Sequence, residues 1–165
     1  MKREIKSLMK TRQMGVLPYT YRDLDSLEEI RDRKIDGVHA YCFYNDKLVL
    51  VYSDKKGYWT PAGGGTEKGE NVEETVIREV KEETNMRVLK QKIIGYQEVF
   101  EPDRIHVQTR SVCLVEPYGP FVSDPDGDIT VIKLIDPKDY KQYFDWGEVG
   151  DYIMQRALEL LKDLK

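Results

Sequence analysis

Three glutamates near the middle of the chain have a spacing that could do chemistry. Glu79, Glu82 and Glu83 stand at positions i, i+3 and i+4, which share one face of a helix. Like charges on one exposed patch repel each other, so the cluster costs stability unless a cation lies on it. A hard divalent ion such as Mg²⁺ or Mn²⁺ takes oxygen ligands and would remove that cost. The spacing predicts a cation-binding helix face, and the alternative is a solvated face.

The segment around these glutamates predicts a helix from Asn71 to Thr84. Asn71 can act as the N-cap, and Glu74 stands three residues later as its capping-box partner. Asn85 follows the last turn, where Asn tolerates the left-handed C-cap conformation. Apolar side chains recur on another side of this helix: Val72, Val76, Ile77 and Val80. We therefore expect one buried face and one carboxylate face.

A glycine-rich segment comes just before the helix. Gly63, Gly64 and Gly65 are consecutive, and Trp59 lies four residues earlier. Glycines let backbone approach a ligand closely. They can also aim carbonyl groups at a metal ion or N–H groups at phosphate oxygens.

These residues together carry a family resemblance. The residues that matter are those at fixed positions along the segment: Gly64, Glu70, Arg78, Glu79, Val80, Glu82, Glu83 and Met86. This order resembles the Nudix box, G-x5-E-x7-R-E-U-x-E-E-x-G-U, in which U is apolar. Asn85 replaces the last glycine, and Asn can serve as the C-cap there. Because so many fixed positions match, the signal is far more specific than a lone glycine motif.

The resemblance implies roles for individual residues. The metal ligands would be Glu79, Glu82, Glu83 and the backbone carbonyl of Gly63, with Mg²⁺ or Mn²⁺ as the cofactor. Arg78 would orient a box glutamate through a charge-assisted hydrogen bond. The general base would be Glu79 or Glu82, and the choice stays open.

The family resembled hydrolyses a nucleoside diphosphate linked to another group. This implies a Mg²⁺-dependent pyrophosphohydrolase acting on a nucleoside triphosphate, ADP-ribose or a dinucleoside polyphosphate. A non-catalytic nucleotide-binding sensor module and an RNA-end pyrophosphohydrolase are the alternatives. The net charge of −4 and the isoelectric point near 5.4 disfavour long nucleic acid as a partner. A homodimer is an expectation from the resemblance alone.

Residues outside the box are candidates for substrate and acid–base roles. Trp59 could stack on a base, and Gly64 and Gly65 could contact substrate. One further acid is expected from the acidic loop of residues 117–128, with Asp128 as first choice over Asp124 and Asp126. His106 is an acid–base candidate, although a partly exposed strand histidine is the favoured interpretation.

The remaining pattern predicts a mixed sheet between helices, in agreement with the α/β/α sandwich that the resemblance implies. Strands are expected at residues 37–44, 47–52, 86–100, 104–115 and 129–135, and an amphipathic helix at 146–165. We expect residues 1–36 to form an N-terminal extension that packs on a Nudix hydrolase domain of residues 37–165. Neither a signal-peptide pattern nor a membrane-length apolar run is present, so cytoplasm is the expected compartment.

Overall fold

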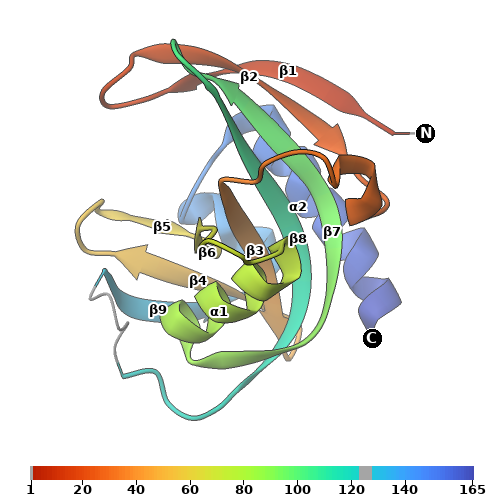
Figure 1. Ribbon diagram of the computed structural model, residues 1–165. Helices are drawn as coiled ribbons and strands as arrows, with labels where there is room; N and C mark the ends of the chain where they lie inside the picture. The colour runs from red at the N-terminus through yellow and green to blue at the C-terminus, as the bar shows by residue number, and fades with distance from the viewer. Residues whose placement is uncertain (1, 123–127) are drawn as a thin grey trace.

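The computed structural model describes residues 2–122 and 128–165, and these residues form one nine-stranded mixed sheet with a helix on each face (Figure 1). Along its main path the strands follow the order β1-β2-β7-β8-β3-β4-β5, with β6 beside β3 and β9 beside β4. The strands are β1 (Glu4–Lys10), β2 (Val16–Asp23), β3 (Gly37–Tyr44), β4 (Lys47–Ser53), β5 (Tyr58–Thr60), β6 (Ala62–Gly65), β7 (Met86–Phe100), β8 (Ile105–Pro117) and β9 (Ile129–Ile135). The helices are η1 (Leu27–Ile30), α1 (Val72–Thr84), η2 (Pro137–Gln142) and α2 (Gly147–Leu164).

The pairing of β3 decides where the glycine-rich segment lies. β3 runs parallel to β8, while every other pairing in the described part of the sheet is antiparallel. β4 pairs only with the last residues of β3, from Cys42 onward. β6 takes the same edge over the first residues, with Gly63 opposite His39 and Gly64 opposite Val38. The glycines are therefore held rigidly beside the start of a central strand.

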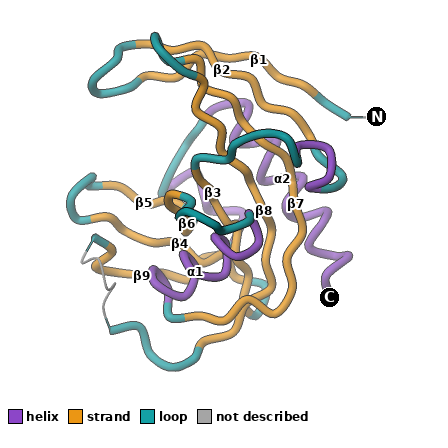
Figure 2. Tube along the Cα trace, in the orientation of Figure 1, coloured by secondary structure: helices purple, strands orange, loops and turns teal. Residues whose placement is uncertain are grey.

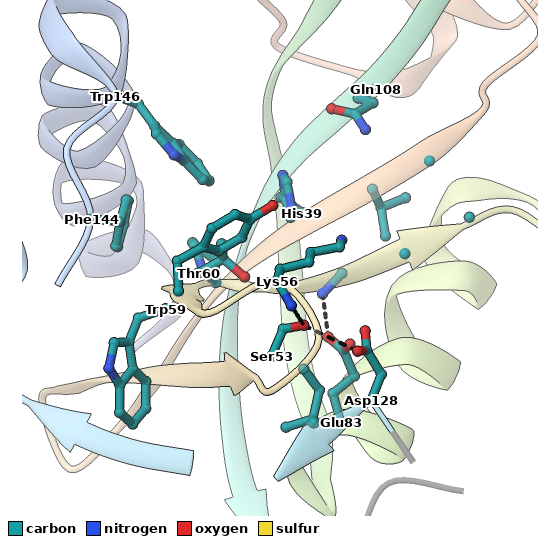
Figure 3. A pocket seen from close by; sticks show the side chains of 18 of the residues that line it. His39, Ser53, Lys56, Trp59, Thr60, Glu83, Gln108, Asp128, Phe144 and Trp146 are labelled. Atoms are coloured by element: carbon teal, nitrogen blue, oxygen red, sulfur yellow. Dashed lines mark hydrogen bonds between the residues drawn. The ribbon is translucent and has the colours of Figure 1, made fainter. Parts of the chain in front are cut away.

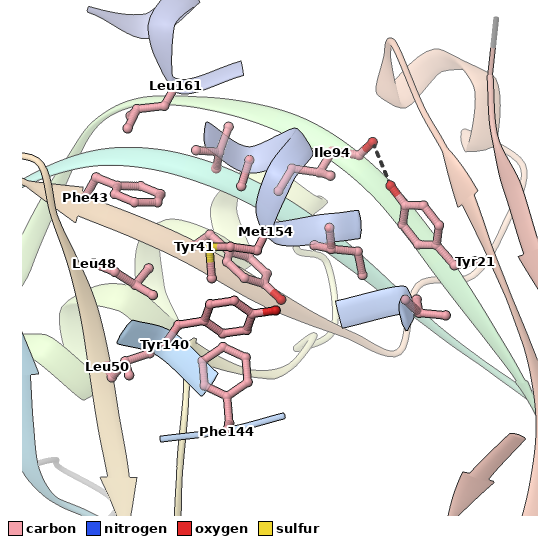
Figure 4. Packing of buried hydrophobic residues seen from close by; sticks show 14 of the residues in the cluster. Tyr21, Tyr41, Phe43, Leu48, Leu50, Ile94, Tyr140, Phe144, Met154 and Leu161 are labelled. Carbon is pink, nitrogen blue, oxygen red and sulfur yellow. Dashed lines mark hydrogen bonds between the residues drawn. The ribbon is translucent and has the colours of Figure 1, made fainter. Parts of the chain in front are cut away.

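Each face of the sheet has its own core. On one face α1 packs over a cluster that includes Val38, Val49 and Val115. On the other face α2 covers a larger, more aromatic cluster built around Tyr41 and Phe43 (Figures 2 and 4). The α/β/α sandwich expected from the sequence is confirmed. In the described part of the chain, neither helix is long and apolar enough to span a membrane.

Helix α1 follows its sequence signals closely. Asn71 accepts a hydrogen bond from the N–H of Glu74 at 2.8 Å, and the Glu74 carboxylate accepts from the N–H of Asn71 at 3.0 Å. Asn85 closes the helix in the left-handed region, at φ 55° and ψ 39°. Ile77 departs from the expectation, because it is 47% exposed. It lies one residue beyond the buried stripe, which turns it about 100° away from the sheet.

The first 36 residues add two strands and one short helix. β1 pairs with β2, and β2 pairs with β7, so this hairpin extends the edge of the main sheet. Ser26 caps η1 through the N–H of Glu28 at 3.2 Å. This helix is a single 3-10 turn that ends at Ile30. The division into an extension and a domain at residue 36 stays a prediction.

Candidate active site

A cleft of 540 Å³ opens where β3, β6 and the start of β9 meet the segment before α2 (Figure 3). Its wall includes the backbone of Gly63, Gly64 and Gly65 and the side chains of Ser53, Lys56, Trp59, Glu83, Gln108, Asp128, Phe144 and Trp146. One end is carboxylate-rich and the other end is aromatic. This polarity suits a ligand with a charged part and a flat apolar part.

Arg78 organises the glutamates at the carboxylate end. Its Nε and Nη2 donate to the two oxygens of Glu70 at 2.7 and 3.0 Å. Its Nη1 donates to Glu79 at 2.9 Å and to Glu82 at 3.2 Å. Nη2 also donates to the carbonyl of Gly65 at 2.9 Å, which ties the helix to β6. The structure therefore places Arg78 as the expected orienting residue, and it holds three carboxylates rather than one.

The electrostatics of this cluster follow from the guanidinium. Hydrogen bonds from Arg78 are the largest cause that lowers the pKa of Glu70, from 4.5 to about 2. The same contacts raise the pKa of Arg78 above its ordinary value. Thr75 and the N–H of Glu67 also donate to Glu70, at 3.0 and 2.9 Å. Glu70 is therefore a structural anchor for Arg78.

The glycines permit close approach to two of the glutamates. The N–H of Gly63 donates to Glu83 at 2.7 Å. A Cβ added to Gly64 would lie 2.5 Å from Cδ of Glu79, so no larger residue fits without moving that carboxylate. Gly63 contacts Glu83 through its N–H, whereas the family resemblance implied its carbonyl as a metal ligand.

Glu82 is less exposed than the sequence suggested. Its side chain is 24% exposed, and Glu79 is more buried still, at 12%. The reason is that Arg78 and the adjoining loop cover the glutamate face. Of the three box glutamates, Glu83 lines the open cleft, while Glu79 and Glu82 lie behind it against Arg78.

The chemistry of the cluster suits a divalent cation, although its ligands are not gathered. Three carboxylates, from Glu70, Glu79 and Glu82, share one guanidinium, and Glu83 accepts from the N–H of Gly63; hard cations prefer such oxygen donors. Within residues 2–122 and 128–165, however, no three His, Cys, Asp or Glu side chains form a group that could hold a metal ion. The donor types fit, and a small rearrangement around Arg78 would be needed to bring the oxygens together.

Asp128 lies at the same end of the cleft as Glu83 (Figure 3). It accepts a hydrogen bond from Ser53 Oγ at 3.0 Å, and Ser53 Oγ accepts one from the N–H of Lys56 at 3.1 Å. The structure thus brings the first-choice additional acid into the site. The alternatives Asp124 and Asp126 lie outside the described residues.

The aromatic end is formed by Trp146 more than by Trp59. Trp146 stacks near His39, with ring centroids 5.4 Å apart, and near Phe144 at 4.7 Å. Trp59 lines the cleft, but its ring packs against Tyr52 and Tyr143 at 5.2 and 5.8 Å. Trp146 was not singled out from the sequence; its position just before the first glycine of an amphipathic helix was the available signal.

His106 lies at the far end of the same cleft, beside Asp36 and Gln108. Its Nδ1 contacts Arg104, an exposed residue that also pairs with Glu101 at 3.0 Å. The arrangement fits a partly exposed strand histidine better than an acid–base group.

Comparisons with known proteins agree with this geometry. The family model described as NUDIX domain matches residues 33–157. The Nudix hydrolase YvcI of Bacillus subtilis is 33% identical over 63 residues, which is 38% of this chain and 40% of YvcI. The match thus spans less than half the length of that curated relative.

Solved structures show the same fold at lower sequence identity. The Bacillus subtilis pyrophosphohydrolase BsRppH superposes with a TM-score of 0.71 at 19% identity, covering 93% of this chain and 96% of that one. The NUDIX domain of Shewanella oneidensis NrtR, solved with ADP-ribose, gives a TM-score of 0.60 at 18% identity and covers 78% and 89%. The family model matches residues 33–157, which is more than half of the chain, so the chain belongs to the NUDIX family.

Proposed function

We propose that this chain is a divalent-cation-dependent hydrolase that cleaves the phosphoanhydride bond of a nucleoside diphosphate linked to another group. One observation carries the proposal: the carboxylates of α1 and the glycine backbone of β6 meet at one end of a cleft whose other end is aromatic. A nucleotide has the matching polarity, with an anionic diphosphate and a flat base.

The chain's own residues would position the diphosphate. The Gly64 and Gly65 backbone and the Lys56 side chain line the cleft and leave room for close contact with phosphate oxygens. Trp146 and Phe144 offer aromatic surface to the base, with Trp59 forming the wall behind. These contacts would orient the anhydride so that water attacks phosphorus from the carboxylate side.

Arg78 would hold the catalytic carboxylates in position. It hydrogen-bonds both Glu79 and Glu82 through the same nitrogen, so each carboxylate is fixed in direction. Either can accept the proton of the attacking water once a small shift brings it forward. Asp128, hydrogen-bonded to Ser53, is a third carboxylate in reach of the cleft.

A Mg²⁺ or Mn²⁺ ion held by Glu79, Glu82 and Glu83 would screen the phosphates and lower the pKa of a bound water. The donor set supports such an ion, because three carboxylates share one guanidinium and Glu83 lies on the same helix beside the glycines. Electrostatic stabilisation of this kind is usually the largest contribution to phosphoryl transfer.

A nucleotide-binding sensor is the second candidate. The cleft alone would serve it, but the intact set of box glutamates is more than a sensor needs. An RNA-end hydrolase would need a cationic track leading out of the cleft, and the net charge of −4 does not favour one. We therefore propose small nucleotides, rather than RNA, as the substrate class.

The test is product analysis after incubating the full chain with Mg²⁺ and a nucleotide panel. The panel holds ADP-ribose, diadenosine polyphosphates, nucleoside triphosphates and a 5′-triphosphorylated RNA, each measured by chromatography with mass detection. We expect cleavage that yields a nucleoside monophosphate, stops with EDTA and returns with excess Mg²⁺. Turnover at an equal rate without divalent cation would overturn the mechanism.

Matched variants separate the two base candidates. Glu79→Gln and Glu82→Gln each remove one negative charge beside the same guanidinium nitrogen. Loss of the base should lower kcat by 10² or more and abolish the acidic limb of the pH–rate profile. The other variant should lower activity through metal affinity, so raised Mg²⁺ should rescue it in part. Rescue of both variants to wild-type rates would exclude both residues as the base.

A further inference from the structure

A second hollow of 660 Å³ adjoins the cleft on the face of the sheet that α2 covers. It lies between β1, the middle of β8 and the first turn of α2. The two hollows share a wall made of His39, Tyr58, Gln108, Asp145 and Trp146. A substrate that occupies the cleft could therefore extend past Trp146 into this second space.

Arg110 forms the buried end of the second hollow. Its residue is 3% exposed, and its Nε has no hydrogen-bond partner in the described residues. The terminal nitrogens donate to the carbonyl of Thr109 at 3.2 Å and, more weakly, to Gln108 Oε1 at 3.4 Å. No described carboxylate forms an ion pair with it. Its guanidinium also lies 6.0 Å from the centre of the Trp146 ring. A buried charge without an ion-pair partner is costly, so the position of Arg110 calls for an explanation.

The surroundings of Arg110 do not neutralise it. The phenols of Tyr19, Tyr21 and Tyr41 lie around the guanidinium, and burial raises the pKa of both Tyr21 and Tyr41, so these phenols are neutral at pH 7. Burial also lowers the pKa of Arg110 itself. The nearby buried carboxylate of Asp23 is already bound by Tyr21, Tyr152 and Arg156.

Buried polar atoms without a hydrogen-bond partner gather around Arg110. Three of the five buried side-chain atoms without a partner in the described chain belong to one face of β3 and β8: His39 Nδ1, Tyr41 Oη and Arg110 Nε. Arg110 is opposite His39 in the parallel register, and Tyr41 follows two residues along on the same face. Arginine and tyrosine both offer protons, so the missing partner is rich in acceptors.

The rim of the hollow carries two carboxylates, which would repel a bound anion, and one lysine. Asp145 and Glu148 line the hollow, but Asp145 accepts from the N–H of Gly147 at 2.9 Å and Glu148 pairs with Arg3 at 3.4 Å. Lys10 lines the opposite rim. The rim carboxylates are exposed to solvent and screened, whereas Arg110 is not.

We propose that this hollow is a second anion subsite, which takes a phosphate group of the substrate other than the diphosphate that is cleaved. Arg110 donates to the phosphate after the Gln108 side chain turns away from the guanidinium. Trp146 separates the subsite from the cleft. The proposal rests on the proposed function, because it names a further feature of that same substrate: a nucleotide with an extra phosphate on its ribose or on its leaving group.

The test compares ligands that differ by one phosphate. Coenzyme A and dephospho-coenzyme A differ at the ribose 3′ position, and NADP⁺ and NAD⁺ differ at the 2′ position. Affinities are measured by calorimetry with Mg²⁺ on the Glu82→Gln background, so that cleavage does not interfere. For at least one pair we expect about 10- to 100-fold tighter binding of the phosphorylated member, the size of one charge-assisted hydrogen bond.

Three variants identify the group responsible. Arg110→Met should abolish the preference, Arg110→Lys should keep part of it, and Arg87→Met, the same change at an exposed site, should leave it intact. Because Arg110→Met removes an unpaired buried charge, it should melt at the parent temperature or above it. A marked fall in melting temperature would instead make Arg110 a structural residue and overturn the proposal.

The outcomes also separate this subsite from the proposed function. Equal affinity within both pairs, no binding of either pair, or a preference that survives Arg110→Met would each overturn the subsite. Absence of metal-dependent cleavage by the wild-type chain would overturn the hydrolase proposal without changing these binding ratios.

Discussion

Arg78→Gln is the substitution whose effect the structure defines most fully. The glutamine keeps part of the stem but removes the guanidinium, and with it the hydrogen bonds to Glu70, Glu79, Glu82 and the carbonyl of Gly65. Three carboxylates are then left close together without a cation. Their side chains are only 12–24% exposed, so water compensates in part.

The magnitude follows from these contacts. A hydrogen bond to a charged group contributes about 1.5–3 kcal/mol, and breaking a buried ion pair costs about 3–5 kcal/mol. Since the pairs here are partly exposed and share one residue, we expect a loss of about 2–4 kcal/mol in unfolding free energy at pH 7. For a chain of this size that corresponds to about 5–15 °C in melting temperature.

The pH dependence gives the prediction its specific signature. Hydrogen bonds from Arg78 are the largest cause that lowers the pKa of Glu70 from 4.5 to about 2, with smaller contributions from the N–H of Glu67 and from Thr75. A carboxylate whose pKa is depressed by folding stabilises the protein above its unfolded pKa, and that stability is lost as pH falls through the folded pKa. The wild-type chain should therefore lose stability between about pH 4.5 and pH 2. In Arg78→Gln this part of the loss should disappear, because the pKa of Glu70 returns toward its ordinary value.

Urea unfolding followed by circular dichroism, in EDTA and at several pH values, measures both effects. Arg31→Gln is the matched control, because Arg31 forms one exposed pair with Glu28 at 3.3 Å and should change stability by less than 1 kcal/mol. Added Mg²⁺ should stabilise Arg78→Gln more than wild type, since it replaces the missing cation. Equal stability of Arg78→Gln and Arg31→Gln, with parallel pH curves, would refute the reasoning.

Two further substitutions test the packing around the site. Gly64→Ala should lower kcat/KM by tenfold or more with little change in melting temperature, because the new Cβ displaces the Glu79 carboxylate. Gly119→Ala is the control, since its Cβ would meet its nearest atom at 3.9 Å. Equal activity of the two variants would contradict the prediction. Val76→Ala should lower the unfolding free energy by about 1.5–3 kcal/mol, since Val76 is fully buried, while exposed Ile77→Ala should stay within about 0.5 kcal/mol in the same urea assay. Similar losses at both positions would contradict the burial of one face only.

The sequence predicted α1 and its surroundings well, because their signals are local. Asn71, Glu74 and Asn85 act through hydrogen bonds within a few residues, so their pattern fixes the ends of the helix without knowledge of the fold. Five strands, β3, β4, β7, β8 and β9, were predicted for the same reason, whereas β1, β2, β5 and β6 were not specified. The exposure of Ile77 was not predicted, since burial there depends on how the helix lies on the sheet.

The site itself was predictable only on its carboxylate side. Glu79, Glu82, Glu83 and the glycines belong to one continuous segment, whereas Lys56, Asp128 and Trp146 come from three others. The segments meet because β3 pairs with β8 in parallel on one edge and with β6 on the other, a pairing that no local pattern specifies.

The same long-range pairing explains why Arg110 escaped notice in the sequence. It stands in a strand whose other residues on that face, such as Val112, are core, and nothing in the local pattern separates a buried arginine from an exposed one. Only the parallel register, which sets Arg110 opposite His39 beneath Trp146, shows that the charge is enclosed and has no ion-pair partner among the described residues. Carboxylates on a helix indicate a reaction from sequence alone, whereas the feature that would select among substrates emerges only from the assembled sheet.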